Sequence, residues 1–388
     1  MNTPKIRFKG FKDDWEQRKV GEFLTESRES GHKGDIAHKM TVKLWGKGVY
    51  EKKETGSANT QYFTRHAGQF IYSKLDFLNC AFGVVPEELE NLETTADVPA
   101  FDCDGVNPYF MFYTAIQPRF YEKNGMIADG SRKAKRIHAD TFLDMPFFVP
   151  SLKEQNKIVN LLSELDNLIT LHQRKCDETK ELKKFMLQKM FPKNGEKNPE
   201  IRFEGFTDDW EQRKFEDVGT VAMCKRIFKE QTSEEGEVPF YKIGTFGGIP
   251  DAYITRELFE EYKKNYQYPN KGDILISASG SIGRTVEYTG KDEYYQDSNI
   301  VWLKHENDLD NSFLKVLYGV IEWSCEGSTI KRLYNDNFLK TEFMLPKIEE
   351  QIKIGEYFSK LDHLITLHQR KCEKLKELKK FMLQNMFV

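Results

Sequence analysis

The sequence predicts an α+β protein in which two α/β domains, in a pseudo-twofold arrangement, are separated by two long antiparallel coiled-coil helices. Three observations lead to this prediction: the chain repeats itself once, each repeat ends in a long helical pattern, and the intervening stretches mix strand and helix signals. The expected boundaries are 1–150 for the first domain, 151–191 for the first long helix, 192–198 for a linker, 199–346 for the second domain and 347–388 for the second long helix.

Two pairs of matching segments define the repeat. Residues 4–19 return as residues 199–214, with Ile-Arg-Phe, Gly-Phe and Asp-Asp-Trp-Glu-Gln-Arg-Lys in common, and residues 165–176 return as residues 361–372. The spacing is about half the chain, which indicates a tandem of two units and not a solenoid of short repeats. The segments between these matching ends differ almost completely in sequence. A duplicated frame with two unlike inserts favours a device that presents two different surfaces in one geometry.

The end of each repeat has the pattern of a long helix. Apolar residues alternate steps of three and four from Ser151 to Met190, and again after Pro346, as in a helix with one partner helix. Ser151 and Glu154 have the spacing of a capping box. Helices of about 40 residues would be ~60 Å long. The predicted partner-helix seam consists of Leu161, Leu165, Leu168, His172, Leu182, Met186, Tyr357, Leu361, Leu364, His368, Leu375, Leu378 and Met382.

Repeat symmetry makes the predicted helix pair antiparallel, because a pseudo-twofold axis relates its two members. The alternative is that each helix packs only on its own domain. The inserts carry mixed signals: residues 271–285 have a strand, Gly-rich turn, strand pattern, 294–303 a strand pattern and 256–264 a helical one. Residues 130–136 and 327–332 occupy matching places, so the two inserts are expected to share a topology.

Composition restricts the class of protein. The chain has 388 residues, 31% of them charged, a net charge of -3 and a mean hydropathy of -0.64. No apolar run approaches the length of a membrane span and no signal-peptide core follows Met1. The six cysteines form no metal-ligand spacing, so we expect no metal site and a reducing, cytoplasmic location. The net charge is not that of a general nucleic-acid coat.

Catalytic motifs are weak or absent in the sequence. No phosphate-binding GxxxxGK[ST] run occurs, and residues 280–283 depart from the GxSxG nucleophile elbow. Asp251, Glu261 and Lys263 have the spacing of nuclease carboxylates, but Glu261 falls in an amphipathic helical pattern, which favours surface charge. We therefore expect no catalytic site in this chain and predict that it binds a partner.

Basic residues near short polar ones are the remaining candidates for a site. Arginine can bind guanine through two hydrogen bonds, while glycine and serine let a backbone approach phosphate. A solvated surface is the alternative, but the clusters recur at the same repeat position in dissimilar inserts. The predicted DNA-binding residues are Lys43, Lys47, Lys74, Arg132, Lys133, Lys135, Arg136, Lys242, Ser279, Ser281, Arg284, Lys331 and Arg332.

The order insert, long helix, insert, long helix resembles the DNA specificity subunit of type I restriction-modification systems. The resemblance is carried by Trp-Glu-Gln-Arg-Lys at 15–19 and 210–214, by Gly-Asp-Ile-Leu at 272–275, and by Pro-x-x-x-Glu-Gln-x-x-Ile at 150–158 and 346–354. It spans nearly the whole chain. The first insert departs from the family pattern, with Gly-Gln-Phe-Ile at 68–71 where Gly-Asp-Ile is expected.

The resemblance implies two target-recognition domains that each recognise one half of an asymmetric bipartite DNA sequence, with the helices as a ruler. It implies two methyltransferase subunits docked on the helices, restriction subunits that complete the nuclease, and a location at the DNA of a prokaryotic cytoplasm. S-adenosylmethionine, Mg²⁺ and ATP would belong to these partners and none to this chain. Two alternatives stay open: a two-headed protein-binding scaffold, and a self-contained nuclease that uses Asp251, Glu261 and Lys263.

Overall fold

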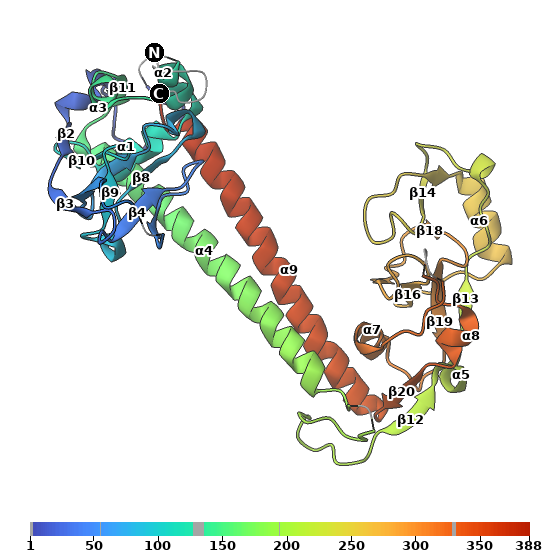
Figure 1. Cartoon of the computed structure of the whole chain (residues 1–388). Helices are drawn as coiled ribbons and strands as arrows, with labels where there is room; N and C mark the ends of the chain where they lie inside the picture. The colour runs from blue at the N-terminus through green and yellow to red at the C-terminus, as the bar shows by residue number, and fades with distance from the viewer. Residues whose placement is uncertain (1–2, 55, 127–135, 194, 328–330) are drawn as a thin grey trace. The chain divides into compact units, whose positions relative to one another are not determined.

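The computed structural model describes residues 3–54, 56–126, 136–193, 195–327 and 331–388. The chain forms two compact units (Figure 1). The first contains Met1–Gln173 and Arg370–Val388, and the second contains Arg174–Gln369. Each unit therefore combines one globular head with parts of both long helices.

Three sheets build the head of the first unit. A four-stranded sheet has the order β2 (Leu24–Ser27), β10 (Ala100–Cys103), β7 (Phe70–Tyr72) and β8 (Phe82–Val84). A five-stranded sheet has the order β3 (Ser30–Lys33), β6 (Gln61–Thr64), β9 (Glu93–Thr95), β4 (Lys39–Val42) and β5 (Val49–Lys52). The third sheet pairs β1 (Glu16–Lys19) with β11 (Pro146–Val149). The helices are α1 (Pro108–Ala115), α2 (Pro118–Gly125) and α3 (Ala139–Leu143), with single 3₁₀ turns at Val20–Glu22, Phe77–Asn79 and Glu87–Leu89.

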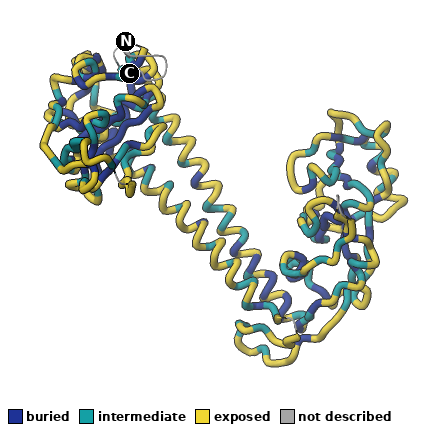
Figure 2. The backbone as a smooth tube through the Cα atoms, viewed as in Figure 1, coloured by how far each residue is buried: buried dark blue, intermediate teal, exposed yellow. Residues whose placement is uncertain are grey.

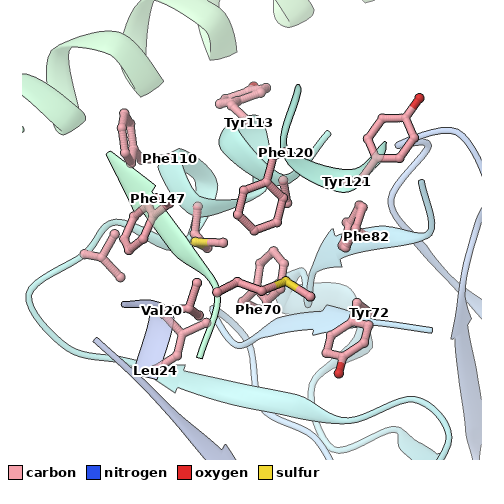
Figure 3. Packing of buried hydrophobic residues seen from close by; sticks show 14 of the residues in the cluster. Val20, Leu24, Phe70, Tyr72, Phe82, Phe110, Tyr113, Phe120, Tyr121 and Phe147 are labelled. Atoms are coloured by element: carbon pink, nitrogen blue, oxygen red, sulfur yellow. The ribbon is translucent and has the colours of Figure 1, made fainter. Parts of the chain in front are cut away.

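Aromatic side chains fill the core of this head (Figure 3). Phe142 of α3 lies against three rings of the four-stranded sheet, with centroid separations of 5.6 Å to Phe70, 4.7 Å to Tyr72 and 5.4 Å to Phe101. The Tyr72 hydroxyl donates a hydrogen bond to the Ile137 carbonyl at 3.0 Å. The start of α3 is thereby fastened to the end of β7.

The head of the second unit repeats this topology. Its four-stranded sheet has the order β13 (Gly219–Met223), β19 (Ile300–His305), β16 (Ile274–Ser277) and β17 (Thr285–Glu287), and β12 (Glu211–Lys214) pairs with β20 (Glu342–Leu345). A three-stranded sheet has the order β15 (Tyr253–Ile254), β14 (Val238–Tyr241) and β18 (Tyr294–Tyr295). The helices are α5 (Phe215–Val218), α6 (Arg256–Asn265), α7 (Asn311–Val320) and α8 (Asn335–Leu339), with a 3₁₀ turn at Lys229–Gln231.

Strand pairing makes the two heads equivalent. β4 pairs antiparallel with β5 and parallel with β9, just as β14 pairs antiparallel with β15 and parallel with β18. β7 and β16 hold the same place in the four-stranded sheets. The shared topology predicted for the inserts is confirmed for the four-stranded and two-stranded sheets, whereas the first head has a five-stranded sheet where the second has a three-stranded one. The single strand predicted at 294–303 is instead two strands, β18 and β19, interrupted where Ser298 adopts a positive φ of 51°.

The two long helices, α4 (Leu152–Lys189) and α9 (Ile348–Asn385), have 38 residues each and pair antiparallel within each unit (Figure 1). In the first unit, the Lys379 ammonium donates to both oxygens of Asp166 at 2.6 Å. In the second unit, Lys183 donates to Asp362 at 2.6 Å. The alternative in which each helix packs only on its own domain is therefore wrong.

Part of the predicted seam lies outside the buried contact. Leu165 and Leu361 are buried, and Leu161, His172, Met186, Tyr357, His368, Leu375 and Met382 are half-buried. Four predicted seam residues are instead 40–44% exposed, which corrects their assignment: Leu168, Leu182, Leu364 and Leu378. Buried and exposed residues alternate along both helices in Figure 2.

Helix geometry explains the correction. The sulfur atoms of Cys176 and Cys372 lie 3.9 Å and 4.0 Å from backbone carbonyl oxygens of the facing helix, so each cysteine points into the helix contact of its unit. At ~100° per residue, Leu168 points ~80° away from Cys176 around α4, and Leu182 points ~120° away on the same side. Their repeat partners on α9 have the same offsets from Cys372. The four leucines therefore lie beside the seam, Leu168 and Leu378 in the first unit and Leu182 and Leu364 in the second.

The repeated segment at the start of each half attaches a head to a long helix. Arg7 donates two hydrogen bonds to the Glu154 carboxylate, at 2.7 and 2.8 Å, and Arg202 does the same with Glu350. Glu154 and Glu350 are each 1% exposed. The hydrogen bond with Glu154 raises the pKa of Arg7 above its usual value. The carboxylate that suggested a capping box with Ser151 is thus bound by Arg7.

The same segment also touches the end of the other long helix. The backbone N–H of Ile6 donates to the carbonyl of Asn385, near the end of α9, at 2.9 Å. In the second unit, the N–H of Ile201 donates to the carbonyl of Lys189, at the end of α4, at 2.9 Å. Each repeated segment therefore joins the start of one long helix to the end of the other, which explains why it recurs with both helices.

Arg7→Ala should destabilise the first unit strongly. The substitution leaves the Glu154 carboxylate buried without its cation, and breaking a buried ion pair in this way costs about 3–5 kcal/mol. Urea denaturation followed by tryptophan fluorescence measures the free energy of unfolding. The matched control is Arg18→Ala, whose partners Glu16 and Glu22 are exposed, and whose expected effect is below about 1 kcal/mol. Equal effects of the two variants would contradict the role given to Arg7.

A fragment of residues 1–191 should form a homodimer. Its α4 can supply a second copy with the contacts that α9 makes in the first unit, because Lys183, Met186, Met190 and Phe191 match Lys379, Met382, Met386 and Phe387. Light scattering after gel filtration gives the mass. Asp166→Lys should return the fragment to a monomer, and the double variant Asp166→Lys with Lys183→Asp should restore the dimer. A monomeric wild-type fragment would argue against pairing through these contacts.

Candidate nucleic-acid interface

The turn between β16 and β17 brings five predicted residues of the second head together. Gly280 N–H donates to the Lys331 carbonyl at 3.1 Å, Ser279 and Arg332 form an isolated β-bridge, and Leu333 N–H donates to the Ala278 carbonyl at 2.9 Å. Segments 50 residues apart in the chain thus lie side by side. The residues of the prediction that meet here are Ser279, Ser281, Arg284, Lys331 and Arg332.

Internal hydrogen bonds hold the shape of this turn. The buried Ser277 hydroxyl donates to the Ser281 carbonyl at 2.6 Å and accepts from the Arg284 N–H at 2.9 Å. Gly280 and Gly283 have positive φ angles of 68° and 86°, a conformation that favours glycine. Ser281 and Arg284 are exposed, whereas Ser279 is only 7% exposed. The turn therefore offers Ser281 and Arg284 to a ligand, and little of Ser279.

Arg284 also links the turn to the loop between β14 and β15, residues 242–252. Its guanidinium donates to the Ile243 carbonyl at 2.6 Å and lies 5.5 Å from the centre of the Phe246 ring. In the same loop, the Lys242 ammonium is 2.9 Å from the Asp251 carboxylate. Lys242, from the predicted set, therefore lies on the loop that Arg284 touches, although Asp251 partly neutralises its charge.

The first head places its predicted residues in the equivalent positions. Ile137 N–H donates to the Lys74 carbonyl at 3.0 Å, directly after β7, just as Leu333 bonds to Ala278 after β16. Arg136, which precedes Ile137, therefore corresponds to Arg332. Its guanidinium is 3.5 Å from the Asp97 carboxylate. Three further predicted residues, Arg132, Lys133 and Lys135, lie outside the described residues.

The loop between β4 and β5 carries the other two lysines of the first head. Lys43 and Lys47 are exposed on this loop, residues 43–48, and the Lys43 ammonium lies 5.1 Å from the centre of the Tyr50 ring. Trp45 N–H donates to the Asn79 carbonyl at 2.9 Å, and Gly46 N–H donates to the Cys80 carbonyl at 2.7 Å. The loop after β4 is thus bound to the loop after β7, and equivalent loops are joined by Arg284 in the second head.

Sequence analysis missed Trp45 as a site residue. It is 61% exposed and has a positive φ of 63°, an outlier for a bulky side chain. The signal was present in the sequence, since residues 43–48 place one tryptophan among two lysines and two glycines. Ile249, which is 88% exposed on the loop between β14 and β15, was missed as well.

Comparisons with known proteins find matches over part of the chain. The profile of the type I restriction-modification DNA specificity domain matches residues 207–377. A Haemophilus influenzae protein named as a type I restriction enzyme specificity subunit is 43% identical over 239 residues, which cover 61% of this chain and 60% of the relative. Residues 207–377 therefore match a type I restriction-modification DNA specificity domain, and the chain is similar to specificity subunits over about three fifths of its length.

One further curated relative and one solved structure extend the comparison. A type I restriction enzyme specificity subunit of Methanocaldococcus jannaschii is 25% identical over 252 residues, which cover 60% of this chain and 59% of the relative. The matched stretches thus span about three fifths of the lengths of these curated relatives. The crystal structure of the type I restriction-modification S subunit of M. genitalium, 14% identical, aligns with 100% of this chain and 99% of that chain at a TM-score of 0.61, which shows a shared fold.

The three residues of the nuclease hypothesis do not converge: Asp251 pairs with Lys242, Lys263 lies 3.6 Å from Asp292, and Glu261 is exposed on α6. Among the described residues, no group of three or more His, Cys, Asp or Glu side chains could hold a metal ion. Within the same residues, no helix is long and apolar enough to cross a membrane.

The long helices carry a second exposed surface, which we name the apolar stripe. In the first unit it comprises Leu168 and Leu171 of α4 with Leu378 and Phe381 of α9, all 40–50% exposed. In the second unit it comprises Leu182 and Phe185 of α4 with Leu364 of α9, all 41–48% exposed. Exposed apolar residues at regular helical spacing indicate a surface that a partner covers. The repeat therefore supplies each unit with its own copy.

Arg284→Ala should loosen the loop between β14 and β15 without unfolding the second head. The variant removes the hydrogen bond to the Ile243 carbonyl, and a net contribution of about 1 kcal/mol predicts roughly fivefold faster amide exchange in residues 242–250. Hydrogen exchange with mass spectrometry provides the rates. Lys264→Ala, in the last turn of α6, is the control and should leave these rates unchanged. Unaltered exchange in the Arg284 variant would mean that other contacts hold the loop.

Proposed function

We propose that this chain is the DNA sequence-specificity subunit of a type I restriction-modification complex, with each head recognising one half of an asymmetric bipartite target. The observation that carries the proposal is the recurrence of one loop arrangement in both heads. The loops after β4 and β7 in the first head, and after β14 and β16 in the second, are joined by hydrogen bonds and carry cations. Since their sequences differ, the two heads would recognise different bases.

The exposed groups have the chemistry that duplex DNA requires. Lysine and arginine side chains and turn N–H groups bind phosphates and set the position of a protein on the duplex. Arg136, Arg284 and Arg332 could also bind guanine edges in the major groove through two hydrogen bonds. Because several cations gather on these loops, a chain with a net charge of -3 can still bind a polyanion.

The paired helices would act as a ruler between the two half-sites. A helix of 38 residues is ~57 Å long, and half-sites must keep a fixed spacing and helical phase to be recognised together. The antiparallel contacts within each unit support this part of the proposal, because a paired helix resists bending better than a single one.

The partners would be methyltransferase and restriction subunits. The two copies of the apolar stripe support two methyltransferase subunits, one at each unit, docked on the helices. S-adenosylmethionine would then bind to the methyltransferase subunits, Mg²⁺ and ATP would serve the partner subunits, and the complex would act on DNA in the cytoplasm.

Exchange of residues 20–145 for the corresponding segment of another specificity chain should change one half of the recognised sequence only. The exchanged segment holds the loops of the first head, whereas the second head and both helices remain. The measurement is methylome sequencing of cells that express the partner methyltransferase with the parent or the exchanged chain. A change in both half-sites would contradict the modular proposal.

A separate variant distinguishes DNA recognition from a protein-binding scaffold. Lys331→Ala with Arg332→Ala should weaken DNA binding by the assembled complex. It should also make the dependence of affinity on salt shallower by about one unit for each phosphate that the side chains no longer bind. Lys340→Ala, after α8, is the control. Unaltered DNA affinity in the double variant, with partner binding abolished instead, would favour the scaffold.

A further inference from the structure

Both heads expose one large apolar side chain on the equivalent hairpin loop. Trp45 is 61% exposed on the loop between β4 and β5, and Ile249 is 88% exposed on the loop between β14 and β15. These hairpins are equivalent because β4 and β14 each pair with the following strand and with β9 or β18 in parallel. The loop sequences differ, so the recurrence concerns the position and the apolar character of the side chain.

The backbone of Trp45 has an unfavourable conformation, and its indole side chain is exposed to solvent. A positive φ of 63° is strained for any residue with a β-carbon, and most of all for a bulky one. The hydrogen bonds from Trp45 and Gly46 to the carbonyls of Asn79 and Cys80 maintain this conformation. Burial of the ring does not offset the strain, since most of the side chain faces water. Strain of this kind is concentrated at functional sites.

The charges around the loop favour DNA over a protein as the ligand of Trp45. Lys43 and Lys47 flank the indole and are exposed, and Lys74 lies on the loop to which residues 43–48 are hydrogen-bonded. Lysine is depleted in protein–protein interfaces but is attracted to phosphates. In the second head, Lys242 and Arg284 accompany Ile249 in the same way. The flat apolar indole can lie against a base, while the lysines beside it bind the phosphates on either side of that base.

We propose that Trp45 stacks on a base at an opened step of the first half-site, and that Ile249 is the apolar wedge of the second. Apolar side chains inserted between base pairs unstack a step and kink the duplex, and aromatic rings stack on bases of any identity. Trp45 would thus favour target sequences in which this base step opens easily. Neighbouring polar groups would recognise the base edges. This inference rests on the proposed function.

Tryptophan fluorescence of the assembled complex tests the stacking directly. The probe is a duplex that carries the target found by methylome sequencing. Trp45 is one of five tryptophans, and Trp15, Trp210 and Trp302 are each 2% exposed, so the difference between wild type and Trp45→Phe isolates the exposed indole. We expect the duplex to quench this difference signal. We also expect Trp45→Ala to lower target affinity about tenfold or more, with an unchanged salt slope because the indole carries no charge to pair with a phosphate.

Three control variants separate stacking from folding and from charge. Trp45→Gly should lose the same affinity without a lower melting temperature, because glycine tolerates the left-handed conformation. Lys47→Ala should instead make the salt slope shallower by about one unit. Ile36→Ala removes an equally exposed apolar side chain, 65% exposed before the start of β4, and should leave affinity unchanged.

The outcomes distinguish this inference from the proposed function. If wild-type complex methylates no bipartite sequence, the proposed function fails. If it does so, but Trp45→Ala binds the target within twofold of wild type, or the difference signal is not quenched, the stacking inference is overturned. Loss of methyltransferase binding in Trp45→Ala, with DNA affinity retained, would show that the indole contacts a protein and would also overturn it.

Discussion

The antiparallel contact between α4 and α9 is the constraint on which the rest of this structure depends. Each unit is closed by chain segments about 200 residues apart, because the first part of one long helix packs against the last part of the other. The buried cysteines at the centre of the contact and the lysine–aspartate pairs beside it repeat in both units. Neither head is complete without the end of the helix that follows the other head, so the two halves must fold together.

The repeated segments and the variable loops have different physical tasks. Arg7 and Arg202 bind buried glutamates at the helix starts, while Gln155 and Gln351 accept hydrogen bonds from the N–H groups of Asn107 and Asp310 in the heads. These groups are buried and leave little freedom for substitution. The loops after β4, β7, β14 and β16 need only keep their mutual hydrogen bonds, so their exposed side chains can change without disturbing the frame. In the proposed function, the recognised target can thereby vary while the frame stays constant.

Sequence analysis succeeded where a local pattern determines the result. The repeat predicted two equivalent units, the three-and-four spacing predicted both long helices, and the Gly-rich pattern at 271–285 predicted the turn of β16 and β17. It failed where the result depends on three-dimensional contacts. Leu168, Leu182, Leu364 and Leu378 satisfy the apolar spacing, yet they lie beside the seam because the buried cysteines point at the facing helix and these leucines point away from that direction. Trp45 was overlooked although its neighbouring lysines and glycines were visible in the sequence, because its exposure and positive φ are known only from the structure.

The amino-acid sequence by itself determined that this protein has a duplicated frame, two paired long helices and two dissimilar inserts, because periodicity and repetition are properties of the chain. Only the tertiary structure decided which residues meet. It joined Ser281 and Arg284 to Lys331 and Arg332, bound the loop of Trp45 to the loop after β7, and directed Glu154 to Arg7. The physical reason is that such contacts arise from strand pairing and burial between distant segments, for which the linear order of residues carries no local signal.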